Sequence, residues 1–183
     1  MRRDRGTAAV EMALAFVVIL MIAIGAYEFG TGFIDRNAMA NAAREGARAG
    51  TAAGDYDNGG TDNADCVVIE AAAGALSGIA GDDVRELWIY ESDDTGFVGL
   101  GGHIQRYRRP FNISEPVDLT CAGGGDWVRV SNTFPPSARA LGSKQWLGVK
   151  LVVDHSWKTN FLFWSGTTTW EEDVVMRLEP ATG

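Results

Sequence analysis

Glu11 is the residue whose type and position most clearly suggest chemistry in this sequence. It is the single charged residue in a run of twenty residues, Ala8–Tyr27. A peptidase that cut after Gly6 would give Thr7 a free amine and make Glu11 the fifth residue of the mature chain. A carboxylate in apolar surroundings needs a cation, and the Thr7 amine of a neighbouring copy is an available one. If the chain is processed between Gly6 and Thr7, the spacing predicts that Glu11 sets the register of packed helices.

The remaining sequence contains little that indicates catalysis or metal binding. No serine lies in a Gly-x-Ser-x-Gly frame, no His-Glu-x-x-His is present, and neither histidine has ligand spacing with a cysteine. Asp55, Asp57 and Gly60 match positions 1, 3 and 6 of an EF-hand loop, but Gly59 and Cys66 replace two of its ligands. A solvated acidic turn is favoured over a calcium site. We expect no enzyme activity, no metal and no cofactor.

Length and charge exclude several other classes of protein. The chain has 183 residues and a formal net charge of -8, with 46% hydrophobic residues and 2 cysteines. This size fits one domain with an appended element, and the composition is too apolar for a disordered chain. Because a phosphate backbone requires a concentrated positive surface, the acidic balance argues against a nucleic-acid partner.

The apolar run predicts a membrane-spanning helix. Twenty helical residues extend about 30 Å, which is the thickness of the hydrocarbon core. Arginines in residues 1–6 precede the span 8–27, and acidic Glu28 and Asp35 follow it. This asymmetry predicts a cytoplasmic leader and an external C-terminal part. Glu11 lies near the cytoplasmic end, so snorkelling to the interface is the alternative to a specific partner.

The helix is expected to continue beyond the membrane, over residues 7–50, a length of roughly 66 Å. Gly30 and Gly32 are its predicted weak point, because each glycine costs about 1 kcal/mol relative to alanine. We expect a bend or a locally melted turn there. Small residues four apart would allow a partner helix to approach closely, unless they reflect alanine richness alone: these pairs are Ala9/Ala13, Ala43/Ala47 and Gly46/Gly50.

An external head is predicted for residues 66–183, after a polar linker at 51–65. Asp65 is expected to cap a second, short helix that ends near Ser77. The basic stretch Arg106–Arg109 is expected in a solvated loop. Helices followed by strands indicate an α+β fold with an antiparallel sheet of about four strands: Val84–Glu91, Trp127–Ser131, Leu147–Trp157 and Val174–Glu179.

Cys66 and Cys121 are both on the predicted external side. An even number of cysteines in an oxidising compartment favours one disulfide, which would close a loop of 56 residues. Two free buried thiols are the alternative.

An aromatic run near the C-terminus has two interpretations. Its side chains either cover the sheet as core, or part of them are exposed as a contact for a partner subunit, a surface or a membrane. The residues are Trp157, Phe161, Phe163, Trp164 and Trp170.

Several stretches carry a resemblance to a known family. Arg5-Gly6, then Ala8-Ala9-Val10-Glu11 and the apolar run, resemble the processing site of type IV pilin-like proteins. Residues 25–30 (GAYEFG) and 42–48 (AAREGAR) are similar to the TadE-like pseudopilins of tight-adherence (Flp-type) pili, and residues 174–179 (VVMRLE) are similar to that family's final strand. Major Flp pilins carry a Glu-Tyr pair and are much shorter, so Glu11-Met12 and the large head favour a minor pilin.

The resemblance implies a function and a set of partners. It implies a minor pilin or pseudopilin that takes part in assembly or in the tip complex of a tight-adherence pilus and supports surface adhesion. The implied partners are other pilin and pseudopilin subunits through the N-terminal helix, a prepilin peptidase and the membrane platform. The implied location is the inner membrane, then the extracellular pilus. The alternatives are a secreted binding domain released by signal peptidase before Ala26, and a permanently anchored envelope protein.

Overall fold

The computed structural model describes residues 4–58, 63–76, 84–93, 95–96, 102–139, 145–159 and 165–178. Two helices precede a six-stranded sheet with the order β3-β4-β2-β1-β5-β6, in which every neighbouring pair is antiparallel. The elements are α1 (Asp4–Ala53), α2 (Ala64–Ala75), β1 (Val84–Ser92), β2 (Ile104–Arg108), β3 (Leu119–Cys121), β4 (Gly125–Asn132), η3 (Pro136–Ala138), β5 (Trp146–Ser156) and β6 (Thr167–Arg177). The predicted α+β fold is confirmed.

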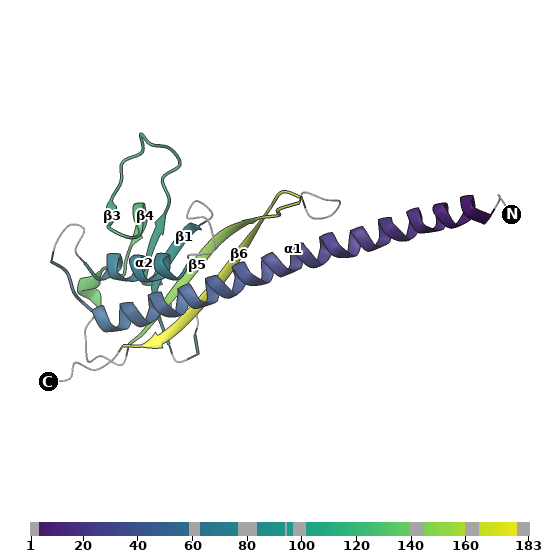
Figure 1. Ribbon diagram of the computed structural model, residues 1–183. Coiled ribbons are helices and arrows are strands. Elements are labelled where there is room, and N and C mark those ends of the chain that lie inside the picture. The colour runs from purple at the N-terminus through teal and green to yellow at the C-terminus, as the bar shows by residue number, and fades with distance from the viewer. Residues whose placement is uncertain are drawn as a thin grey trace.

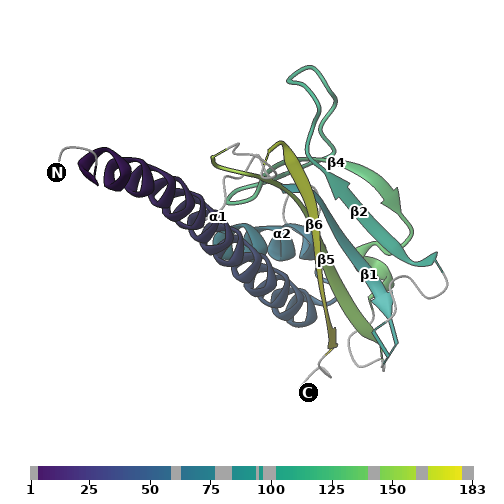
Figure 2. The same cartoon turned by 90° about the vertical axis from the view of Figure 1, so that its right-hand side faces the viewer.

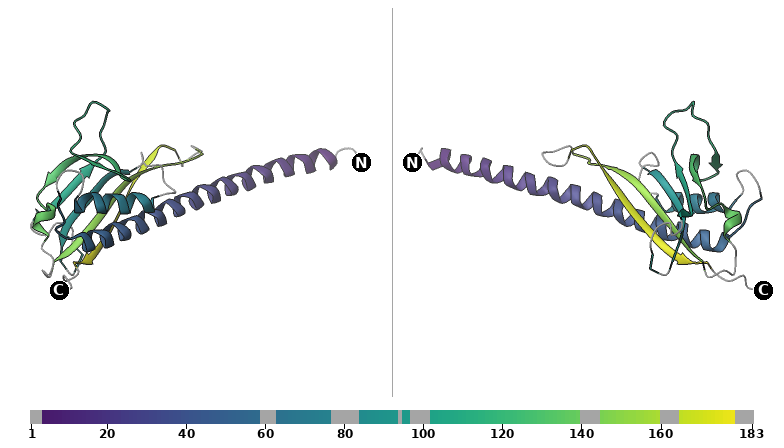
Figure 3. Two further views of the ribbon diagram at one scale, coloured as in Figure 1. Left: turned by 60° about the vertical axis from the view of Figure 1, so that its left-hand side comes forward. Right: turned by 180° about the vertical axis from the view of Figure 1, so that it is seen from behind.

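α1 is one unbroken helix of 50 residues. Its N-terminal half projects away from the head, and its C-terminal half lies along the sheet (Figure 1 and Figure 3). The helix ends at Ala53, three residues beyond the expected end at Gly50. Gly54 stops it, because it adopts a positive φ of 55° and its N–H donates to the Gly50 carbonyl at 3.0 Å.

The predicted weak point of α1 is helical in the structure. The helix passes through Gly30 and Gly32 without a melted turn. Gly32 is buried against the head, and a Cβ atom there would lie 3.3 Å from the Trp170 ring. The missing side chain at this position therefore permits close packing, which offsets the intrinsic cost of glycine in a helix. A bend at these glycines remains a prediction.

The number of strands was predicted too low, because the sheet has six strands where about four were expected. β2 and β3 were missed. The basic stretch Arg106–Arg109 is mostly strand β2 rather than a loop, and Arg106 and Arg108 face the side of the sheet opposite to buried Gln105 and Tyr107. β6 begins at Thr167, seven residues before the expected start, and pairs with β5 along its whole length.

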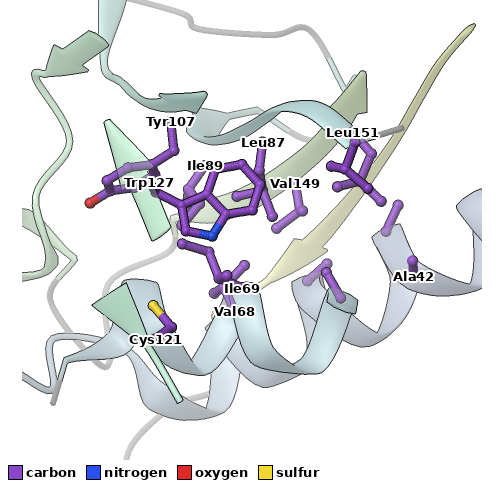
Figure 4. Close-up of a cluster of buried hydrophobic side chains, with 14 of the residues drawn as sticks. Ala42, Val68, Ile69, Leu87, Ile89, Tyr107, Cys121, Trp127, Val149 and Leu151 are labelled. Carbon is purple, nitrogen blue, oxygen red and sulfur yellow. The ribbon is translucent and has the colours of Figure 1, made fainter. Parts of the chain in front are cut away.

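Both helices cover one face of the sheet (Figure 2). The main core lies between them and the inward side chains of the strands (Figure 4). The small residues of α1 lie in this layer: a Cβ atom on Gly46 would lie 3.4 Å from Ala72, and one on Gly50 would lie 2.8 Å from Val68. The partner helix expected for the Gly46/Gly50 pair is therefore α2 of the same chain, and Ala43 and Ala47 are buried in the same core. Ala9 and Ala13 are exposed.

The N-cap of α2 was predicted wrongly. The side-chain oxygen of Asn63 accepts hydrogen bonds from the backbone N–H groups of Asp65 and Cys66 at 3.0 and 3.1 Å. Asp65 itself is buried, where it pairs with buried Arg139 at 2.5 Å and accepts a hydrogen bond from the Tyr107 hydroxyl at 2.6 Å. Burial and the nearby carboxylate raise the pKa of Tyr107. A long-range charge partner, absent from the local sequence, explains why Asp65 points inward.

A disulfide joins Cys66 to Cys121. It connects the first turn of α2 to the last residue of β3, and both cysteines are buried. The bond therefore holds an edge strand of the sheet to the helical layer.

Candidate functional site

The projecting half of α1 carries most of the exposed large apolar side chains of the described residues. The helix is long and apolar enough to cross a membrane: its most apolar stretch of 18 residues has a mean hydropathy of 2.5, and only 6% of that stretch is buried. Large side chains are exposed all around it, among them Met12, Phe16 and Ile22. A surface helix of a water-soluble protein has one apolar stripe and one polar side. This segment therefore needs an apolar environment outside its own chain.

Glu11 interrupts that surface near its free end. It lies one turn after Thr7 on the same side of α1, because residues four apart in a helix are neighbours. Glu11 is exposed, and the described residues place no cation within salt-bridge distance of it. The structure thus places a carboxylate on an apolar helix far from the head. The roles of Gly6, Thr7 and Glu11 in processing and register remain predictions.

A polar junction joins α1 to the end of the β5–β6 hairpin. Glu28 is 0% exposed, and its carboxylate accepts hydrogen bonds from the backbone N–H groups of Lys158, at 3.2 Å, and Thr159. Two turns further along α1, the Asp35 carboxylate lies 3.0 Å from Nδ1 of buried His155. We call Glu28, Asp35 and His155 the junction clamp. It attaches the hairpin to α1 directly after the predicted membrane span.

Aromatic rings surround the junction clamp. The Trp170 ring stacks on the His155 ring with centroids 4.1 Å apart, and Trp157 meets the same ring edge-on at 4.9 Å. Both tryptophans are half-buried. They lie beside α1, because both line a hollow with Phe29 and Phe33 of that helix. The β5–β6 hairpin runs alongside α1 toward its projecting half (Figure 1). The other members of the predicted aromatic run, Phe161, Phe163 and Trp164, lie outside the described residues.

An open apolar hollow of about 540 Å³ lies where the hairpin meets the helix. Exposed Phe29 and Phe33 of α1 lie on one side of it, and the two tryptophans lie on the other. The lining residues are Phe29, Gly30, Gly32, Phe33, Arg36, Trp157 and Trp170.

A second exposed surface was not predicted from the sequence. The loop 109–118 between β2 and β3 extends from the sheet (Figure 1), and its Phe111 and Ile113 side chains are exposed. Glu115 holds the base of the loop, because it pairs with Arg108 and accepts a hydrogen bond from the Phe111 N–H at 2.7 Å. The Arg108 and Phe111 hydrogen bonds lower the pKa of Glu115 to about 2. The signal in the sequence that could have indicated this exposed surface is the presence of apolar residues between residues that favour turns.

The described residues contain no group of three or more side chains that could hold a metal ion. The acidic turn that was weighed as a calcium loop is only partly described, because Gly60 lies outside the described residues. An antiparallel bridge between Asp57 and Asn63 closes the base of this turn.

We predict that Glu28→Ala loosens the hairpin end while the sheet remains folded. The substitution removes both acceptors for the Lys158 and Thr159 amides, and an unmade hydrogen bond to a charged group costs about 1.5–3 kcal/mol. Hydrogen exchange at these two amides should therefore accelerate by about tenfold or more. Glu45→Ala, which removes an exposed carboxylate from the same helix, should leave their exchange unchanged. Equal exchange in both variants would contradict the clamp.

Comparisons with known proteins bear on the first quarter of the chain. No curated protein and no solved structure matches the chain significantly. The family model of TadE-like proteins matches residues 6–48, which include Glu11, the projecting helix and the two α1 residues of the junction clamp. The resemblance predicted from the sequence is thereby confirmed, and residues 6–48 form a TadE-like segment.

Proposed function

We propose that this protein is a minor pilin or pseudopilin that takes part in assembly, or in the tip complex, of a tight-adherence pilus. The TadE-like family suggests a protein associated with such pili. The observation that carries the proposal is the projecting half of α1: an apolar helix that is exposed on all sides and carries one carboxylate near its free end. A helix of this kind can be stored in a bilayer and later packed among other helices in a filament.

The physical argument concerns the environment of this helix. Transfer from lipid to a helical filament core replaces one apolar environment with another, so the span need not be exposed to water. Processing after Gly6 would create the Thr7 amine, which is a cation able to pair with Glu11 of a neighbouring copy. Since an unpaired carboxylate in such a core is costly, packing with the correct register is favoured over other registers.

The head supplies the surfaces by which one subunit differs from another. Its partners in this proposal are other pilin and pseudopilin subunits, a prepilin peptidase and a membrane platform, with the N-terminus on the cytoplasmic side. The loop 109–118 is our candidate for the adhesive or subunit contact, because it exposes the apolar side chains of Phe111 and Ile113. Trp157 and Trp170 are less suited to a contact at the filament tip, since they lie against α1.

The N-terminal residue of the mature protein tests this proposal. We predict that mass spectrometry of the protein from its native host identifies Thr7 as that residue. Gly6→Leu should block processing and leave the arginine-rich start in place, whereas Gly30→Leu should not affect the cleavage. A mature chain that starts at Ala26 would support a secreted domain instead, and an uncleaved chain in the wild type would support a permanent anchor.

A further inference from the structure

Five residues from three segments of the chain form a ring-rich surface beside the end of the apolar span. We call Phe29, Phe33 and Arg36 of α1, Trp157 after β5, and Trp170 of β6 the aromatic rim. Together with two glycines they line the 540 Å³ hollow. Phe29 and Phe33 are 64% and 69% exposed.

The level of the aromatic rim is fixed by helix geometry. Phe29 and Phe33 lie two and six residues beyond Tyr27, the end of the apolar run, which is about 3 and 9 Å along the helix axis. The headgroup layer of a bilayer is about 5–8 Å thick on each side of the hydrocarbon core. If residues 8–27 span the core, Phe29 lies within the headgroup layer and Phe33 lies at its outer edge. The junction clamp attaches the hairpin that carries Trp157 and Trp170 to this part of α1.

Charge at the aromatic rim is suited to an anionic surface. Arg36 is exposed, and it makes no salt bridge with any side chain of the described residues. Helical side chains lean toward the N-terminus of their helix, so Arg36 leans back toward the span. The nearby carboxylates of Glu28 and Asp35 are already engaged by backbone amides and by His155.

We propose that the aromatic rim binds phospholipid in the outer leaflet, with Arg36 at the phosphate and the upper acyl chain in the apolar hollow. This inference rests on the proposed membrane anchoring of the protein. The rim is continuous with the apolar span, and aromatic rings with an apolar body and a polar end favour the interface between lipid and water. A neighbouring helix would contact residues along the length of α1. The rim residues instead come together from three segments of the chain beside the end of the apolar span.

Fluorescence quenching by brominated lipid tests this proposal. The full chain would be reconstituted in vesicles of phosphatidylcholine and phosphatidylglycerol with bromine on the acyl carbons nearest the glycerol. We expect quenching of tryptophan emission, and Trp157→Phe and Trp170→Phe should each remove part of the quenchable emission. Trp88→Phe is the matched control, because Trp88 lies on the sheet face opposite to α1. It should remove emission that the lipid does not quench.

Charge reversal provides a second, independent measurement. Arg36→Glu should weaken the contact between the rim and anionic vesicles about fivefold or more, which would appear as a loss of quenching. Arg44→Glu, an exposed position two turns further along α1, should leave the quenching unchanged. Thermal unfolding monitored by circular dichroism would confirm that both variants remain folded.

Three results would overturn the inference. Emission from Trp157 and Trp170 that the bromines do not quench would show that the rim stands clear of the bilayer. Quenching that depends on protein density at a constant amount of lipid would assign the rim to a second copy of the chain. Release of the protein from the vesicles by an alkaline wash would overturn the membrane anchoring itself, and the lipid contact with it.

Discussion

Glu11→Ala is expected to leave membrane insertion intact and to remove the protein from assembled filaments. Insertion depends on the apolar run, which becomes more apolar when the carboxylate is deleted. Assembly loses a buried ion pair and leaves the Thr7 amine without its partner, a change that costs about 3–5 kcal/mol. This cost corresponds to roughly a hundredfold or greater loss of incorporation. The measurement is the ratio of protein in the sheared filament fraction to protein in the membrane fraction.

Two companion variants make this result specific to the carboxylate. Met12→Ala changes an exposed side chain of the same turn without changing charge, and it should assemble normally. Glu11→Gln preserves the shape of the side chain and should show most of the loss, since a neutral amide cannot pair with the amine as strongly. Normal incorporation of Glu11→Ala would exclude the role of Glu11 in register and leave snorkelling as the explanation of its position.

Replacing both cysteines, as in Cys66→Ser with Cys121→Ser, is expected to lower the free energy of unfolding by about 4 kcal/mol. The bond closes a loop with a sequence separation of 55, and the entropy that it removes from the unfolded chain scales with the logarithm of that length. A loss of this size approaches the whole free energy of unfolding of many domains. Denaturant unfolding of the full chain in detergent, followed by circular dichroism, measures this loss.

Reduction provides the control for the disulfide. A thiol reductant should lower the unfolding midpoint of the wild type to that of the double variant, and it should not change the double variant itself. A wild type that is insensitive to reductant would contradict a stabilising bond between α2 and β3.

The helical half of the fold could be predicted because its determinants are local. Twenty consecutive residues with a single charge indicate a spanning helix, and the absence of proline up to Pro110 allows it to continue. The helix was expected to end at Gly50, because glycine is a common stop signal for a helix. In the structure the helix continues to Ala53, and the missing side chain of Gly50 permits close packing against Val68 and Leu147. The sequence does not distinguish a glycine that ends a helix from one that accommodates a neighbour.

The strands that were missed carry little apolar character of their own. β2 reads Ile-Gln-Arg-Tyr-Arg, and its inward positions are Gln105 and Tyr107 rather than aliphatic residues. Tyr107 can be buried because its hydroxyl donates to Asp65 and accepts from Gln105 at 2.9 Å. The first half of β6 is mainly threonine and acidic residues, which suits a sheet edge that is exposed on one side. These patterns can be recognised as strands only when the elements that pack beside them are known.

The junction clamp could not be predicted from the sequence, because it also depends on elements that are distant along the chain. Glu28 was interpreted only as an acidic residue that helps to orient the membrane span. Its hydrogen-bond donors are 130 and 131 residues away along the chain, and their backbone amides carry no side-chain signature. Trp157 and Trp170 were selected from the sequence as possible contact residues, and that role stays a prediction. Their position beside the helix depends on how the hairpin returns to α1.

The continuity of α1 has a mechanical consequence. Many surface domains are joined to their anchors by flexible segments that let the two parts turn independently. Here the helix runs from its free end into the core of the head without a break, and the junction clamp adds a second attachment. Any rotation of the helix about its own axis therefore turns the head through the same angle. An assembly machine that holds only the apolar end would transmit torque directly to the loop 109–118 and would set the direction in which it faces.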